Sequence, residues 1–176
     1  MCKRRNNISN IILSQHKGEF SKILVLVDGS QPSINAADRA IALAKKEKDN
    51  PQLLIALHVV FSRVGYAYSP EGVFGMDGLT TPNAMKEILE NAKKEAQQWF
   101  DNIKGKINMD NNIQLQPDVV VTATSIVSAI VEYAKNKDVD LIVIGTRGRS
   151  GFKKLLLGSV ASGVVTNAAC PVMVVK

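Results

Sequence analysis

The sequence predicts an open α/β fold, in which a parallel five-stranded sheet carries helices on both faces. Short apolar segments alternate along the chain with longer segments of helical periodicity, the order expected of repeated strand–helix–strand units. The apolar segments are hydrophobic at nearly every position rather than at every second one. That composition is typical of strands buried on both faces, as in a parallel sheet.

Length and composition indicate one domain with a full core. The chain has 176 residues, and 45% of them are hydrophobic. We expect residues 1–20 to form a mobile N-terminal extension and residues 21–176 to form the domain. No apolar run approaches the roughly 18 residues that span a bilayer, and the basic start lacks the apolar core of a signal peptide. We therefore expect a cytoplasmic protein without a membrane partner. Cys2 and Cys170 have no spacing that indicates a metal site or a disulfide.

The positive charge lies mostly in the N-terminal extension. The net charge is +6, and residues 1–22 hold five lysines and arginines against one glutamate. A solvated tail explains this balance, and contact with nucleic acid is the alternative. Because the chain lacks the aromatic platforms that bind single strands, we do not expect a nucleic-acid partner.

The first half of the sheet and its first helix are clear in the sequence. Residues 22–28 are an apolar run of branched side chains, which predicts the first strand. A helix should begin after Ser30, its N-cap, with Pro32 in the first turn, and fade near residues 48–51. Residues 53–60 repeat the pattern of a buried strand.

The remaining chain continues the alternation after one long interruption. Residues 62–82 contain four glycines and two prolines, which exclude a regular element and predict a loop that borders the ligand edge. Residues 83–104 predict the longest helix, and Trp99 on its apolar side is interpreted as core rather than as a ligand platform. The last predicted elements are strand 113–121, helix 125–135, strand 140–144, helix 159–167 and strand 172–175.

The segment after strand 140–144 has the pattern of an anion site. Gly145 and Gly148 follow the strand, and after nine more residues Gly158 and Ser159 begin a helix. This places free N–H groups and a helix N-terminus beside a strand end, which suits a phosphate. Ser159 can cap the helix and offer its hydroxyl, and Arg147 adds positive charge. The alternative is that these glycines only form tight turns.

Two other residues carry chemistry near the predicted strand ends. Asp28 can accept hydrogen bonds from a ribose or a base, or it can simply form a turn with the two residues after it. His58 could act as a base, but no serine or cysteine nucleophile has a suggestive spacing to it, so we interpret it as structural. The sequence contains no Gly-x4-Gly-Lys-Ser/Thr motif and no Gly-x-Gly-x2-Gly motif after the first strand. A P-loop ATPase and a dinucleotide-binding fold are therefore not expected.

The pattern Gly-x2-Gly-x9-Gly-Ser resembles the nucleotide-binding signature of the universal stress protein family, in its ATP-binding branch. Leu57-His58-Val59 and the terminal stretch 170–175 also fit, so the resemblance covers about residues 21–176. It implies a Rossmann-like sheet of strand order 3-2-1-4-5. It also implies that ATP binds, with Mg²⁺ or Mn²⁺ as an accompanying ion. The implied nucleotide-binding residues are Asp28, Val59, Gly145, Arg147, Gly148, Gly158, Ser159 and Val160.

Two of these residues have roles that the resemblance defines. Asp28 corresponds to an adenosine-contacting aspartate, and Val59 to a position whose backbone contacts adenine. The sequence departs from the family in three places: the N-terminal extension is extra, Val121 to Ser125 lack a glycine and proline, and Ala161 stands where a hydroxyl residue is common. The last two departures leave the glycine signature intact.

The implied function is an ATP-dependent module in the stress response or in signalling. The first alternative is slow ATP hydrolysis at the same site, for which Asp28 is the candidate base, so the question of enzyme activity stays open. The second alternative is nucleic-acid binding through the basic tail. We also expect a homodimer through strand 172–175, because an apolar edge strand invites pairing, and Met173→Pro should break it.

Overall fold

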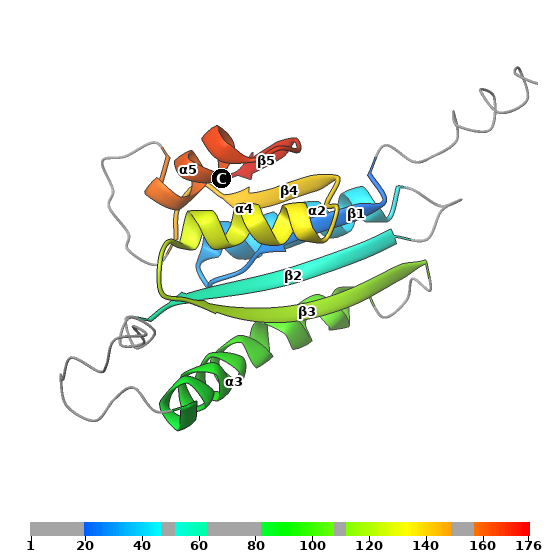
Figure 1. Cartoon of the computed structure of the whole chain (residues 1–176). Coiled ribbons are helices and arrows are strands. Elements are labelled where there is room, and N and C mark those ends of the chain that lie inside the picture. Colours follow the sequence, from blue (N-terminus) through cyan, green and yellow to red (C-terminus); the bar gives the residue numbers. More distant parts are fainter. Residues whose placement is uncertain (1–19, 47–51, 63–81, 108–111, 149–156) are drawn as a thin grey trace, which may run out of the picture.

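A computed structural model of the chain describes residues 20–46, 52–62, 82–107, 112–148 and 157–176. Its strands form one parallel sheet of order β3-β2-β1-β4-β5, which confirms the predicted fold and strand order (Figure 1). The elements in chain order are β1 (Lys22–Leu26), α2 (Gln31–Ala44), β2 (Gln52–Phe61), α3 (Pro82–Ile107), β3 (Ile113–Thr122), α4 (Ile126–Asn136), β4 (Leu141–Gly145), α5 (Ser159–Asn167) and β5 (Val172–Val175).

Helices cover both faces of the sheet, as the buried strands require (Figure 1). Helices α2 and α3 pack on one face, where Ile23 and Val25 of β1 join the core. Helices α4 and α5 pack on the other face, against Leu24 and Leu26. Because successive strand residues point to opposite faces, one apolar run supplies both layers of the core.

The first strand is shorter than the sequence indicates. Strand β1 ends at Leu26 rather than at Asp28, although Val27 still donates its N–H to the carbonyl of Leu57 at 3.0 Å. The chain then turns away at Gly29, whose φ of +80° is a conformation that residues with side chains rarely adopt. This turn carries Asp28 out of the sheet and toward the end of β4.

Helix α2 begins as predicted and ends early. Ser30 is its N-cap and accepts a hydrogen bond from the N–H of Ser33, but the helix stops at Ala44 instead of fading near residue 48. Helical spacing alone predicts that Ile34 lies on the apolar face with Ala37 and Ile41. The buried face is rotated slightly from this one, since Ser33 is 4% exposed and Ile34 is 38% exposed.

The other predicted boundaries differ little from the structure, and two predictions lie outside it. Phe20 packs against the core, and the rest of the predicted N-terminal extension lies outside the described residues. Residues 63–81 of the predicted loop also lie outside them. Among the helices described, none is both long and apolar enough to cross a membrane.

Candidate functional site

A cavity of about 370 Å³ opens at the carboxyl ends of β1, β2 and β4. In an open parallel sheet this edge holds the ligand, at the point where the strand order reverses between β1 and β4. All eight residues predicted for the site line this cavity. The complete lining is Leu26, Val27, Asp28, His58, Val59, Val60, Phe61, Ile126, Ile130, Ile144, Gly145, Thr146, Arg147, Gly148, Gly158, Ser159, Val160 and Ala161.

Asp28 presents one carboxylate oxygen to the cavity and uses the other to shape its own turn. Its Oδ1 accepts from the Ser30 N–H at 3.0 Å and from the Ser30 hydroxyl at 2.6 Å. Its Oδ2 makes no hydrogen bond within the described residues and faces Gly148. A Cβ atom on Gly148 would stand 2.6 Å from this oxygen, so a side chain there would push the Asp28 carboxylate out of its present position. The turn and the open acceptor, which the sequence left as alternatives, are therefore both present.

The glycine signature folds the chain closely around the end of β4. Gly145 packs against Pro32 at the start of α2, where a Cβ atom would lie 2.7 Å from the proline carbonyl carbon. Gly158 donates its N–H to the carbonyl of Thr146 at 2.7 Å, and Thr146 donates to the carbonyl of Val175. These bonds bring the two ends of the segment 146–158 together beside the strand, although its residues 149–156 lie outside the described part.

Helix α5 begins at the cavity with backbone donors that have no backbone partner among the described residues. Gly158 is the N-cap, not Ser159 as the sequence suggested, and Ser159 is the first helical residue. Because the first N–H groups of a helix have no partner within it, those of Ser159, Val160 and Ala161 are available to a ligand. A helix N-terminus also favours negative charge.

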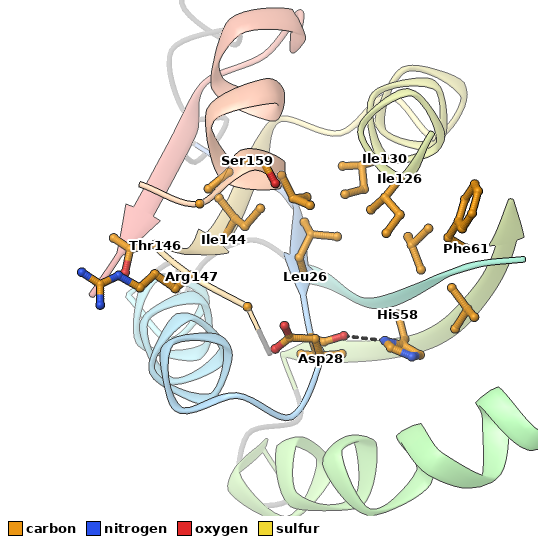
Figure 2. A pocket seen from close by; sticks show the side chains of 18 residues that line it. Leu26, Asp28, His58, Phe61, Ile126, Ile130, Ile144, Thr146, Arg147 and Ser159 are labelled. Carbon is orange, nitrogen blue, oxygen red and sulfur yellow. Dashed lines mark hydrogen bonds between the residues drawn. The ribbon is translucent and has the colours of Figure 1, made fainter. Parts of the chain in front are cut away.

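The side-chain charge of Arg147 is less well placed than the start of α5 to contact an anion in the cavity. Figure 2 shows its guanidinium extending outward, away from Asp28 and Ser159. Its backbone nevertheless belongs to the site, since its carbonyl lies 3.5 Å from the Ser30 hydroxyl. In this conformation an anion in the cavity would meet backbone N–H groups rather than the side-chain cation.

The opposite side of the cavity is an apolar wall. We define this wall as Val59 and Phe61 of β2 together with Ile126 and Ile130 of α4. The labelled members lie together on one side of the cavity, away from Thr146 and Arg147 (Figure 2). Phe61 is 44% exposed, so part of its ring is open where it lines the cavity.

His58 lies buried beneath the cavity and contacts the end of β1, which agrees with its interpretation as a structural residue. It is 5% exposed, and its Nδ1 lies 2.8 Å from the carbonyl of Val27. A carbonyl only accepts, so Nδ1 carries the proton. The ring stands nearly perpendicular to that of Trp99, at a centroid distance of 5.1 Å. Trp99 itself packs against the core, as expected. No partner for the other nitrogen, Nε2, is found in the described part of the chain.

Sequence reasoning missed several residues of the lining. Phe61 stands two positions after Val59, so strand alternation could have placed both on one face. Helical periodicity places Ile126 and Ile130 on the apolar face of their helix, but it does not show which end of a helix meets a cavity. Within the described residues, no group of three or more acidic, histidine or cysteine side chains is arranged to hold a metal ion.

Comparison with known proteins gives a consistent result. A sequence profile described as the Universal stress protein family matches residues 19–176. The universal stress protein MJ0531 of Methanocaldococcus jannaschii is 33% identical over 169 residues, which cover 96% of this chain and 89% of that protein.

Solved structures agree with the fold. The structure of MJ0577, from the same organism, has a TM-score of 0.69 and 25% identity, and the match covers 90% of this chain and 96% of that one. A universal stress protein in complex with cAMP has a TM-score of 0.50 and 25% identity, covering 89% of this chain and 97% of its own.

Proposed function

The chain belongs to the universal stress protein family, and on that basis we propose that it binds ATP in the cavity at the carboxyl edge of its sheet. The proposal is supported by the way in which polar and apolar groups divide that cavity. The related structure with bound cAMP supports an adenine nucleotide as the ligand class. Nucleotide binding would make the protein a stress-response or signalling module.

The polar side of the cavity fits the phosphates. Gly148 and Gly158 leave room for close approach of the backbone, and the first N–H groups of α5 can donate to a phosphate at that helix start. The Ser159 hydroxyl adds a donor at the same place (Figure 2). These groups lie after the end of β4 and at the start of α5, so the fold itself brings them to the cavity.

The other groups fit the nucleoside. The Asp28 Oδ2, without a partner among the described residues, can accept a hydrogen bond from a ribose hydroxyl. The apolar wall can hold the base, with the Val59 backbone at its edge. Mg²⁺ or Mn²⁺ would enter with the triphosphate, because Mg²⁺ is held mainly by phosphates, water and one or two carboxylates. Asp28 is the carboxylate in the described lining.

The experiment is to denature the purified full-length chain and identify any nucleotide that it releases, and then to titrate nucleotide-free protein with ATP by calorimetry. The double variant Gly148→Val/Gly158→Val should lose at least about tenfold in affinity, since its side chains fill the space near Asp28 and Thr146. Gly105→Ala is the matched control, because a Cβ there meets nothing within 4 Å. Unchanged ATP affinity in a folded double variant would overturn the proposal.

A further inference from the structure

The ladder between β1 and β2 ends in an irregular way. Leu26 pairs with Leu57, and Val27 donates to the Leu57 carbonyl at 3.0 Å. In a parallel ladder, a residue that donates to one partner accepts from the residue two positions further along that partner. The next bond should therefore run from the Val59 N–H to the Val27 carbonyl. Among the described backbone groups this bond is not made. His58 Nδ1 donates to the Val27 carbonyl instead, at 2.8 Å (Figure 2, dashed line).

The alternation of the strand shows where the freed groups of Val59 point. Leu57 directs its carbonyl toward β1, whereas Ser62 donates its N–H to Thr122 of β3. Because successive residues of a strand alternate between its two neighbours, Val59 directs its N–H and its carbonyl toward the β1 side. Strand β1 has already ended at that level, and Val59 lines the cavity there.

The Val27 carbonyl is held by a rigid donor. Val27 is 5% exposed, so its carbonyl needs a hydrogen bond from the protein. His58 is equally buried, and Trp99 stands against its ring at a centroid distance of 5.1 Å. The side chain thus fixes the end of β1 without using a backbone donor of β2.

We propose that His58 is a positioning residue for base recognition, because it takes the place of the Val59 N–H on the Val27 carbonyl and so leaves that N–H for the edge of adenine. The Val59 carbonyl lies beside it on the same strand edge, where β1 has turned away at Gly29. This inference rests on the proposed function, since the base must enter the same cavity. Adenine presents an acceptor at N1 beside a donor at its amino group, which complements one N–H and one carbonyl. Guanine presents the opposite order on that edge, so the same pair discriminates against it.

Two substitutions distinguish the role of the His58 hydrogen-bond donor from the role of its ring in packing. His58→Phe keeps a ring against Trp99 and removes the donor, whereas His58→Asn keeps a donor at the same reach from the backbone. In His58→Phe the Val27 carbonyl can be satisfied by the Val59 N–H, which closes the ladder. The full-length wild type and both variants are compared by amide hydrogen exchange of Val59 and by titration with ATP, GTP and inorganic tripolyphosphate.

We expect only His58→Phe to change, and only in the properties that depend on the Val59 N–H. Without ligand, the Val59 amide should exchange fast in the wild type and in His58→Asn, and at least about tenfold more slowly in His58→Phe. The affinity for ATP should fall about tenfold in His58→Phe alone, the ratio that one lost hydrogen bond produces. Its preference for ATP over GTP should fall with it. Tripolyphosphate should bind all three proteins equally, because it has no base.

Three results would overturn the role of His58: a Val59 amide as protected as that of Leu57 in the ligand-free wild type, unchanged exchange in His58→Phe, or an equal loss of tripolyphosphate binding. If His58→Phe does not fold, the wild type still tests the open ladder, because a Val59 amide as protected as that of Leu57 overturns the role of His58. If the wild type binds no ATP, the proposed function fails separately, and the exchange data test the ladder on their own.

Discussion

Gly29 shows how a single residue can hold the site in shape. Its φ is +80°, and a Cβ atom there would lie 2.4 Å from Cζ2 of Trp99. We predict that Gly29→Ala lowers the free energy of unfolding by at least about 2 kcal/mol, because the backbone strain adds to the clash. It should also weaken ATP binding, since the turn carries Asp28. Urea unfolding measures the first effect, and calorimetry measures the second.

Gly105→Ala is the control for this prediction. Gly105 lies in α3 with open space around its Cβ position, so alanine should raise the free energy of unfolding by up to about 1 kcal/mol. A Gly29→Ala protein as stable as the wild type would show that Trp99 moves aside easily, and that the turn does not depend on glycine.

Phe61 gives a second test at the scale of one side chain. If its ring lies against the base, Phe61→Ala should reduce the affinity for ATP by roughly 1–3 kcal/mol, the usual range for base–aromatic stacking. Tripolyphosphate should bind as in the wild type. Val165→Ala is the control, because Val165 is 47% exposed and lies outside the cavity lining. Equal loss for ATP and tripolyphosphate would contradict a contact with the base.

Some features of the site could be predicted from the sequence, and others could not. The glycines around β4 could be identified because close packing leaves a spacing pattern in the chain. The bond from His58 to Val27 could not, because it joins residues on neighbouring strands and depends on where β1 stops. Likewise, the N-cap of α5 is Gly158, one residue earlier than expected. Glycine and serine are both common at N-caps, so the sequence could not distinguish Gly158 from Ser159.

At the scale of elements, helix α4 is attached to the edge strand β3 by a side-chain hydrogen bond. The Tyr133 hydroxyl donates to Asp118 Oδ2 at 2.7 Å. We predict that Tyr133→Phe lowers the free energy of unfolding by about 1 kcal/mol near pH 7, the usual net value of one hydrogen bond. Chemical denaturation of both proteins measures the difference. An unchanged free energy would mean that solvent replaces this bond at no cost.

The pH dependence of the same pair has a defined sign. Burial first, and then the hydrogen bond and charge of Asp118, raise the pKa of Tyr133 above its ordinary value. The folded state therefore favours the neutral phenol, and the stability that it contributes is present below pH about 10 and is lost above it. The difference between wild type and Tyr133→Phe should narrow as the pH rises past 10. A difference that grows there would contradict the assignment.

Elements were predicted better than their ends. Apolar runs and helical periodicity were sufficient for every element described, and α5 and β5 have the expected bounds. Strand order could not be predicted in the same way, because periodicity does not say which strands are neighbours. It came from the resemblance of the glycine signature, which the structure and the family profile confirm.

At the scale of the whole molecule, the two edges of the sheet differ in how well they are protected against pairing with another strand. On β3, Asn112 and Thr122 accept bonds from β2, so the residues at odd positions point to the open edge. Two of these are blocked, because Pro117 has no N–H and the N–H of Val119 is bonded to Asp118 Oδ1 at 2.8 Å. Natural sheets use such features to prevent pairing at an edge.

The other edge, β5, has no comparable protection among the described residues. The carbonyls of Pro171 and Val175 accept from β4, so Met173 also faces β4, whereas Val172 and Val174 direct their backbone groups outward. This corrects the choice of Met173→Pro as a test, because that change would break the sheet itself. The outward position to change is Val174.

We predict that the protein is a homodimer in which two copies of β5 pair antiparallel about a two-fold axis. Such pairing satisfies the outward backbone groups of both copies and covers side chains that are half-buried in one chain. Val174→Pro should give a folded monomer, since proline is tolerated where the missing N–H points away from the sheet. Sedimentation at micromolar concentration, with circular dichroism as the check of folding, distinguishes the outcomes. A monomeric wild type would refute the dimer, and a dimeric Val174→Pro protein would place the interface elsewhere.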